Sequence, residues 1–193
     1  MIYLASQSPR RAELLRQIGV QYQVHAADID ERKAVGETPV EYVCRMAKTK
    51  ARVAQEAIAR SESSWVIIAA DTTIALDGDV IGKPEDTGDC CRILRMLSAR
   101  QHQVLTAVAV ATPDWLEHRL NRSRVEFRAL RETEISAYCA CQEPRDKAGA
   151  YAVQGRAAIF IERLEGSYSG VMGLPLCETA ELLRHAEIEI LEQ

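Results

Sequence analysis

No block of basic residues interrupts this chain of 193 residues: its 24 lysines and arginines and 28 aspartates and glutamates are spread along the sequence, for a net charge of −4. A general nucleic-acid-binding protein would carry a basic stripe, so this distribution argues against that class of protein. The chain also lacks an apolar run near the roughly 20 residues that span a membrane, and its N-terminus lacks the apolar region of a signal peptide. We therefore expect a cytoplasmic protein that binds neither nucleic acids nor membranes. A site for one phosphorylated small molecule stays open.

The C-x-x-C pairs that are typical of zinc sites and redox-active thiols are also missing. The six cysteines are Cys44, Cys90, Cys91, Cys139, Cys141 and Cys177. Their spacing favours free, mostly buried thiols in a reducing compartment. The four histidines are scattered without the spacing of metal ligands, so we expect them to be structural or exposed.

The length and the hydrophobic content of 47% are sufficient for one domain with a substantial core, over residues 1–193. Hydrophobic periodicity predicts that strands and helices alternate in a mixed α/β domain. The expected strands are residues 2–5, 22–26, 65–70, 80–81, 103–111, 119–127 and 157–161. The expected helices are residues 8–18, 39–59, 89–97, 132–141 and 174–185. The longest helix begins at a capping box, Thr38-Pro39-Val40-Glu41.

The most informative segment is Ser6-Gln7-Ser8-Pro9-Arg10-Arg11, which opens the first predicted helix. Ser8 suits the N-cap position and Pro9 the first helical residue, so Arg10 and Arg11 fall in the first turn. Two guanidinium groups at the positive end of a helix dipole are unfavourable unless an anion joins them, and arginine suits phosphate or carboxylate oxygens. The alternative is an ordinary capped helix whose two arginines point into water.

Three later segments carry further groups suited to a ligand site. Asp71 is expected at the carboxyl end of the buried strand 65–70, where a partly desolvated carboxylate can act as a general base or bind a metal. Lys83, between Gly82 and Pro84, could place an ammonium on a phosphate chain. Gln154 has an amide suited to reading a base edge. The alternatives are a turn-forming aspartate, a solvated lysine and a plain glycine-bearing loop.

These segments follow one another in a defined order: Ser-x-Ser-Pro-Arg-Arg, Ala-Asp-Thr, Gly-Lys-Pro, Asp-Lys-Ala-Gly-Ala-Tyr-x-x-Gln-Gly and Gly-Leu-Pro-Leu. The order resembles the Maf family of nucleoside triphosphate pyrophosphatases over nearly the whole chain. The Asp-Lys-Ala-Gly-Ala-Tyr segment looks like that of the subgroup acting on dTTP and UTP. The resemblance implies an elongated mixed β-sheet flanked by helices, with two lobes around a central cleft, similar to the inosine-triphosphatase type.

The resemblance also implies roles for individual residues. Asp71 matches the family's proton acceptor. The implied catalytic residues are Asp71, Lys83, Lys50 and Arg11, and the implied substrate-binding residues are Ser6, Arg10, Thr72 and Gln154. Glu31 and Asp71 would bind a divalent cation, Mg²⁺ or Mn²⁺, because hard cations prefer oxygen ligands.

The activity that the resemblance implies is hydrolysis of dTTP and UTP to the monophosphate and pyrophosphate, with a role in removing non-standard nucleotides. Modified pyrimidine triphosphates share the same base edge and stay open as substrates. The alternative is a nucleotide-binding regulator of septum formation without significant catalysis. The oligomeric state is also left open, with a homodimer among the options.

Overall fold

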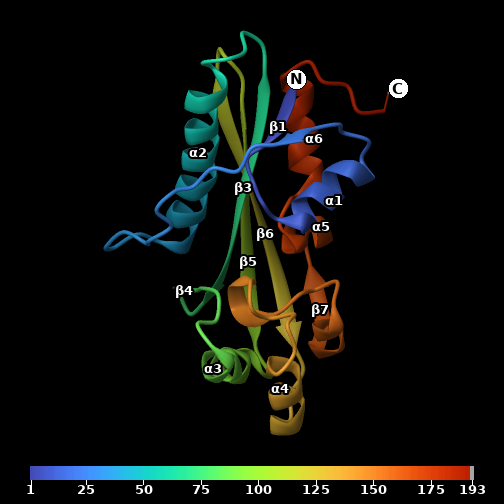
Figure 1. Ribbon diagram of the computed structural model, residues 1–193. Coiled ribbons are helices and arrows are strands. Elements are labelled where there is room, and N and C mark those ends of the chain that lie inside the picture. Colours follow the sequence, from blue (N-terminus) through green and yellow to red (C-terminus); the bar gives the residue numbers. More distant parts are fainter. Residues whose placement is uncertain (192–193) are drawn as a thin grey trace.

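An elongated mixed β-sheet forms the centre of the computed structural model, which describes residues 1–191 (Figure 1). The seven strands follow the order β2-β1-β3-β5-β6-β7, and β4 pairs with β3 outside this path. The strands are β1 (Ile2–Leu4), β2 (Gln23–Val24), β3 (Val66–Leu76), β4 (Asp79–Ile81), β5 (Gln101–Ala111), β6 (Leu116–Phe127) and β7 (Ile161–Glu165). Strand β1 runs parallel to β2 and β3, whereas the other pairs are antiparallel. The predicted mixed α/β architecture is confirmed.

Helices cover both faces of the upper half of this sheet. Successive side chains of β3 point to opposite faces, and because the strand is apolar there, both faces must be buried. Ile67 and Ala69 pack under α2 (Pro39–Ile58). Ile68 and Ala70 pack on the other face, against α1 (Pro9–Gln17) and α6 (Leu176–His185). A short helix, α5 (Tyr168–Met172), lies on that face as well (Figure 1). We call this half the upper lobe.

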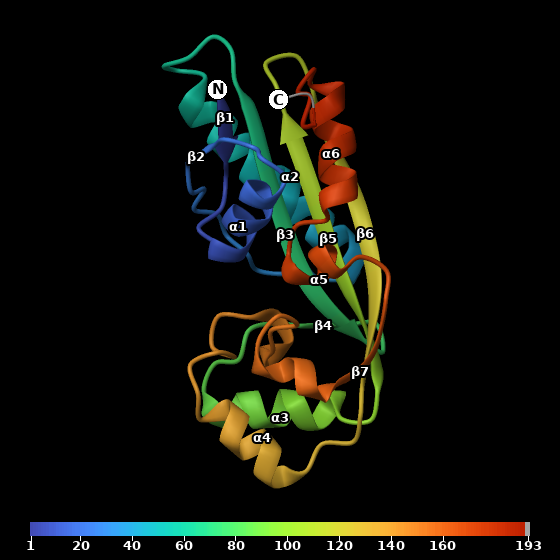
Figure 2. The ribbon, with the colours of Figure 1, turned by 90° about the vertical axis from the view of Figure 1, so that its right-hand side faces the viewer.

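The lower lobe gathers around the other end of the long strands (Figure 2). It contains α3 (Thr87–Leu97), α4 (Glu132–Cys139) and two 3₁₀ turns, η1 (Ala148–Ala150) and η2 (Arg156–Phe160). Ile74 of β3 belongs to a separate core cluster here, together with Leu94, Phe127 and Phe160. Each lobe therefore has its own core, and β3, β5 and β6 connect them.

A gap in the strand pairing lies between the two lobes. On one edge of β3, pairing with β1 ends at Ile68 and pairing with β4 begins at Ile74. On the opposite edge, β5 pairs with β3 continuously from Ile67 to Ala75. In the part of the chain that the structure describes, no strand covers the first edge of residues 69–73, so side chains on both faces of β3 reach this opening.

Two predicted helix starts are correct in position. The capping box of α2 is confirmed, since Thr38 Oγ1 accepts from the Glu41 N–H at 3.3 Å and Glu41 Oε2 accepts from the Thr38 N–H at 2.8 Å. Helix α1 begins at Pro9 after Ser8, as predicted, but the Ser8 side chain makes no capping hydrogen bond. The Ser8 N–H instead donates to Ser6 Oγ at 3.1 Å.

Three predicted boundaries are wrong. Strand β3 does not end before Asp71 but continues to Leu76, because pairing with β5 continues beyond the apolar run. Residues 157–161 were expected as a strand, yet most of them form η2, and β7 begins at Ile161. The segment 165–173, which lies outside the expected strands and helices, contains α5, and Ser167 caps this helix by accepting from the Gly170 N–H.

The expectation of six free thiols is also wrong, because Cys90 and Cys139 form a disulfide between α3 and α4. Their Cα atoms are 5.8 Å apart, within the range a disulfide requires. Of the four free cysteines, Cys177 is exposed and the other three are only partly buried. No helix within residues 1–191 has the length and apolar character needed to cross a bilayer.

The disulfide should stabilise the lower lobe, because it closes a loop of 49 residues in the unfolded chain. We expect Cys90→Ser/Cys139→Ser to lower the free energy of unfolding by about 4 kcal/mol, measured by urea denaturation under non-reducing conditions. Exposed Cys177→Ser should leave it unchanged. Equal midpoints for the wild type and the double variant, with and without reductant, would show that the bond does not stabilise the fold.

Candidate active site

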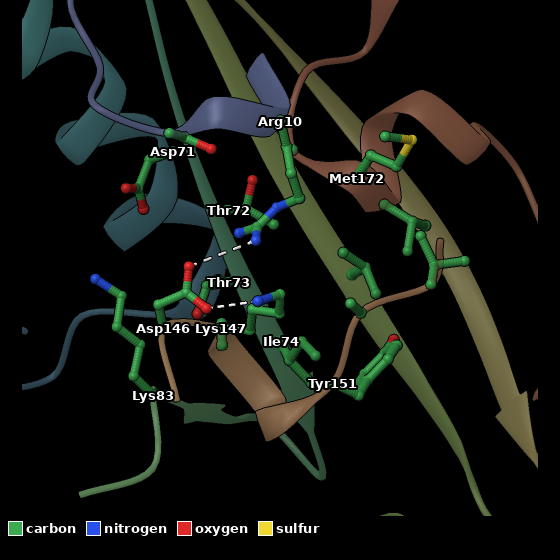
Figure 3. Close-up of a pocket in the computed structure, with 18 of the residues that line it drawn as sticks. Arg10, Asp71, Thr72, Thr73, Ile74, Lys83, Asp146, Lys147, Tyr151 and Met172 are labelled. Carbon is green, nitrogen blue, oxygen red and sulfur yellow. Dashed lines mark hydrogen bonds and ion pairs between the residues drawn. The ribbon is translucent and has the colours of Figure 1, made fainter. Parts of the chain in front are cut away.

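A cleft of about 320 Å³ opens at the gap in the pairing of β3, between the two lobes (Figure 3). Its upper wall comes from the start of α1, the loop before α2, and the end of α5. Its lower wall comes from the segment after β4 and from residues 146–154. The predicted residues that line it are Arg10, Arg11, Glu31, Lys50, Asp71, Thr72, Lys83 and Gln154. Residues from most of the chain length therefore meet in one cavity.

A buried ammonium joins two carboxylates at one end of the cleft. Lys50 Nζ, on α2, lies 2.7 Å from Asp71 Oδ1 and 2.6 Å from Glu31 Oε1. Lys50 and Asp71 are each 8% exposed, whereas Glu31 belongs to an exposed loop. Partial burial opposes ionisation of Glu31, but the hydrogen bond and charge of Lys50 outweigh it and lower the pKa of Glu31. Both carboxylates are thus held beside a cation at this end of the cleft.

Arg11 closes the upper wall by binding three neutral oxygens. Its Nε donates to the carbonyl of Gly173 at 2.8 Å, and its two Nη atoms donate to Ser6 Oγ at 3.1 Å and Thr72 Oγ1 at 3.4 Å. Burial lowers the pKa of Arg11, and the charge of Asp71 partly offsets this effect. Because its hydrogen-bond acceptors carry no charge, the positive charge of Arg11 is available to an anion in the cleft.

Ser6 differs from the other predicted site residues, because it is absent from the cavity wall and lies behind Arg11. Its hydroxyl accepts from Arg11 and from the Ser8 N–H, so it shapes the start of α1. Thr72 is also tied from behind: the Thr106 hydroxyl lies 3.0 Å from Thr72 Oγ1 and 2.7 Å from the carbonyl of Gly170. Both residues are placed to orient their neighbours.

Two ion pairs cross the cleft from one lobe to the other. Arg10 Nη1 lies 3.7 Å from Asp146 Oδ2, and Lys83 Nζ lies 3.9 Å from Glu31 Oε2 (the first is dashed in Figure 3). Asp146 also accepts from Lys147, and this contact outweighs partial burial to lower the pKa of Asp146. The anion expected beside Arg10 is therefore, in the structure, a carboxylate of the same chain.

Asp146 was not assigned a role from the sequence. It is part of the Asp-Lys-Ala-Gly-Ala-Tyr segment, but nothing local indicates that this loop faces the first turn of α1. Gly149 explains the position of the loop: it has a φ of 70°, and a Cβ there would overlap Ile74 of β3. The glycine thus lets the loop pack directly on the central strand.

The opposite end of the cleft is apolar and was missed in the sequence analysis. Ile74, Val104, Tyr151 and Met172 contribute to its wall (Figure 3). The Tyr151 hydroxyl lies 2.8 Å from Nε2 of His102, which is 2% exposed. Burial raises the pKa of Tyr151 and lowers that of His102 to about 4, so both groups are neutral at pH 7. An apolar wall of this kind suits a planar ring.

The donor set fits a hard divalent cation only in part. Within residues 1–191, no group of three or more histidine, cysteine, aspartate or glutamate side chains is arranged to hold a metal ion. Glu31 and Asp71 do place carboxylate oxygens around the same point, that of Lys50 Nζ. Mg²⁺ is commonly bound through one or two carboxylates together with phosphate oxygens of a substrate. These two residues fit such a shared site.

Comparison with known proteins adds independent findings. A family model described as Maf-like protein matches residues 1–186. A dTTP/UTP pyrophosphatase of Methylobacillus flagellatus is 50% identical over 98% of this chain and 94% of its own length. A dTTP/UTP pyrophosphatase of Aromatoleum aromaticum is 51% identical over 94% of this chain and 93% of its own. One of Ralstonia nicotianae is 49% identical over 98% and 95%.

Among solved structures, the Staphylococcus aureus Ham1 protein matches 96% of this chain and 97% of its own, at 13% identity and a TM-score of 0.44.

The buried His102 should make stability depend on pH. Its folded-state pKa of about 4 lies below the ordinary 6.5, so the unfolded chain takes up a proton first as pH falls. Between pH 7 and 4 this group should remove about 3 kcal/mol of stability. Urea denaturation of the wild type and His102→Gln should show the variant losing less stability over this range. Parallel pH profiles would contradict the role of His102.

Proposed function

The chain belongs to the Maf family, and from this premise we propose that it hydrolyses dTTP and UTP between the α- and β-phosphates, to the nucleoside monophosphate and pyrophosphate. The observation that carries the proposal is the pair of unlike ends in one cleft. One end holds Asp71 beside Lys50 and Glu31, and the other is an apolar wall that includes Tyr151; Gln154 lines the same cleft. The names of three relatives at 49–51% identity support the same activity and substrates.

At the polar end, Asp71 is proposed to orient a water molecule and accept its proton as the water oxygen attacks the α-phosphorus. The bond from that phosphorus to the bridging oxygen breaks, and pyrophosphate leaves with the bonding electrons. Lys50 Nζ, 2.7 Å from Asp71 Oδ1, holds the carboxylate in place for the attack. Arg11 and Lys83, which also line the cleft, offset charge on the phosphates and on the leaving pyrophosphate.

A divalent cation, Mg²⁺ or Mn²⁺, is proposed to bind Glu31 and Asp71 together with phosphate oxygens. When bound, it would neutralise part of the phosphate charge and act as a Lewis acid. Glu31 and Asp71 both contact Lys50 Nζ in the structure, so the ammonium stands between the oxygens that a cation would share.

Arg10, Thr72 and Gln154, which line the cleft, are proposed to select the substrate. Thymine and uracil present the same edge, with acceptors at O4 and O2 and a donor at N3. One side-chain amide can bind both, because it has an acceptor oxygen and two N–H donors. Cytosine has an amino group at C4 and an unprotonated N3, so it presents the opposite pattern and would leave both groups of the amide unmatched as long as the amide keeps one orientation.

The homodimer and the cytoplasmic location stay proposals. Size-exclusion chromatography with light scattering would test the first, and fractionation of cells that express the chain would test the second.

The activity is tested by pyrophosphate release from a panel of nucleoside triphosphates with Mg²⁺, with Mn²⁺ and with EDTA. We expect release from dTTP and UTP, dependent on the metal, and at least a 10³-fold lower rate for Asp71→Asn, roughly the factor associated with loss of a general base. Near-normal turnover in Asp71→Asn would refute the assigned role of Asp71. If the wild type binds nucleotides but releases no pyrophosphate, the result would instead favour the alternative, a nucleotide-binding regulator of septum formation without significant catalysis.

Gln154 should control base selection more than rate. We expect Gln154→Ala to reduce the preference for dTTP over dCTP about 10-fold, the effect of one specificity hydrogen bond. The rate at saturating dTTP should change much less. The measurement is kcat/KM for both nucleotides. An equal loss on every triphosphate would make Gln154 a structural residue.

A further inference from the structure

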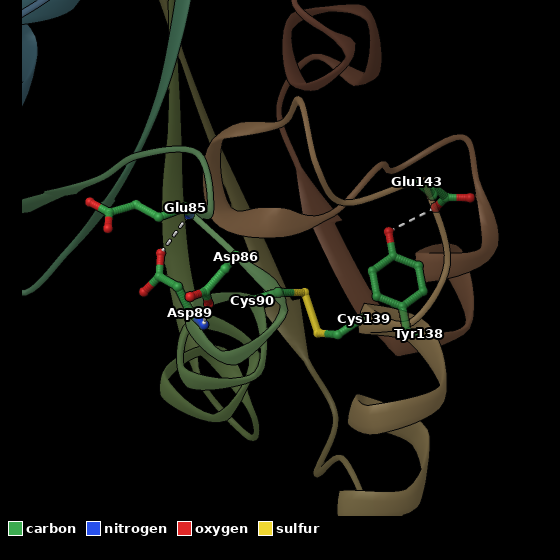
Figure 4. The surroundings of a disulfide bond; sticks show 7 residues. All are labelled: Glu85, Asp86, Asp89, Cys90, Tyr138, Cys139 and Glu143. Carbon is green, nitrogen blue, oxygen red and sulfur yellow. Dashed lines mark hydrogen bonds between the residues drawn. A yellow bond between two sulfur atoms is a disulfide. The ribbon is translucent and has the colours of Figure 1, made fainter.

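The loop that carries Gln154 is held from below by one carboxylate, that of Glu143. Its Oε1 accepts from the Tyr138 hydroxyl at 2.8 Å, and its Oε2 accepts from the Arg156 N–H at 3.0 Å (Figure 4 shows the first bond). The Ala157 N–H also points to Oε1, at 3.4 Å. Glu143 therefore caps the start of η2, two residues after Gln154.

The residue between Gln154 and this cap fits the arrangement. A Cβ built on Gly155 would overlap the carboxylate of Glu143. The φ of Gly155 is −106°, which any residue can adopt, so the backbone conformation does not require glycine. Glycine is required because the Glu143 carboxylate lies too close to leave room for a Cβ. Gly155 and Glu143 thus form one matched contact.

The other side of Gln154 is fixed as well. Tyr151, three residues before it, is buried and contacts His102, and Ala152 and Val153 are buried too. Gln154 itself is exposed and lines the cleft. The backbone is therefore anchored before and after a single exposed amide.

Glu143 is itself firmly placed. It follows α4, which the Cys90–Cys139 disulfide joins to α3 (Figure 4). Partial burial opposes its ionisation, but the hydrogen bonds from Arg156 and Tyr138 outweigh this effect and lower the pKa of Glu143. At neutral pH the side chain is a carboxylate, which accepts hydrogen bonds on both oxygens. An uncharged residue there could not hold all three donors.

We propose that Glu143 is a positioning residue for base selection: by fixing the backbone at residues 155–157, it sets where the Gln154 amide lies in the cleft. This inference rests on the proposed function for the identity of the base. It does not require Glu143 to touch the substrate. A displaced amide should bind the correct base less well and discriminate less against the wrong one.

The test compares the wild type with Glu143→Ala, Gly155→Ala and the double variant. The first readout is the ratio of kcat/KM for dTTP to that for dCTP. The second is the ratio of the dissociation constants for α,β-methylene dTTP and dCTP, measured by calorimetry. Ile135→Val is the matched control, because Ile135 is buried on the same helix as Tyr138 but contributes no hydrogen bond to the loop.

We expect Glu143→Ala to lower both ratios about 10-fold, mainly through a higher KM for dTTP, as for loss of one well-placed hydrogen bond. Gly155→Ala should lower them as well, because its methyl group displaces Glu143. The double variant should be no worse than Glu143→Ala, since the overlap is then removed. Ile135→Val should keep the wild-type ratios even if its melting temperature falls. If Glu143→Ala does not fold, Gly155→Ala decides the question.

Unchanged ratios in Glu143→Ala and Gly155→Ala would overturn the inference while leaving the pyrophosphatase activity intact. An equal loss of kcat on both nucleotides, without a change in selectivity, would also overturn it. If the wild type releases no pyrophosphate, the proposed function fails, and the binding ratios still decide the role of Glu143. If the wild type binds both analogues equally, Gln154 does not select the base. Glu143 then positions no selective amide, and the inference is overturned too.

Discussion

The interrupted edge of β3 is the constraint on which the rest of the structure depends. Pairing with β5 is continuous along β3 from one lobe to the other, while the opposite edge has no partner strand between Ile68 and Ile74 in the described chain. In a strand paired on both edges, side chains on the two faces of the sheet are separated by the sheet and cannot reach the same cavity. At this edge, Asp71 and Thr72, on opposite faces, both reach the same cavity. The pairing gap thus brings α2 and α1 into one site through a single strand.

The charges of the cleft follow from that geometry. Lys50 comes from α2, on the face of Asp71, and Arg11 from α1, on the face of Thr72. Buried Lys50 needs a partner, and Asp71 supplies one at 2.7 Å. Removing Lys50 would leave the buried Asp71 without its ion-pair partner, whereas Lys50 would keep Glu31 if Asp71 were removed. Asp71 therefore constrains Lys50 by stability as well as by chemistry. The cationic wall and the carboxylate are therefore maintained together.

Local features were predicted from the sequence, and long-range ones were not. The capping box at Thr38 and Glu41 was predicted because its two hydrogen bonds lie within four residues. The end of β3 was misjudged because the apolar run stops at Ala70, whereas the backbone pairing with β5 continues through the polar residues 71–73. The Cys90–Cys139 bond depends on the packing of α3 on α4, which no spacing encodes.

The same division applies to the site. The resemblance to a family implied that Glu31, Lys50 and Asp71 lie together. Their spacing in the sequence does not imply it. Asp146 and Glu143 were overlooked because their partners, Arg10 and the turn after Gln154, are brought to them only by the fold. The two ion pairs across the cleft also make any polyanionic ligand a competitor of the protein's own carboxylates. Binding of such a ligand is then an exchange of anions at Arg10 and Lys83. When the ligand leaves, Arg10 can pair again with Asp146, and Lys83 with Glu31.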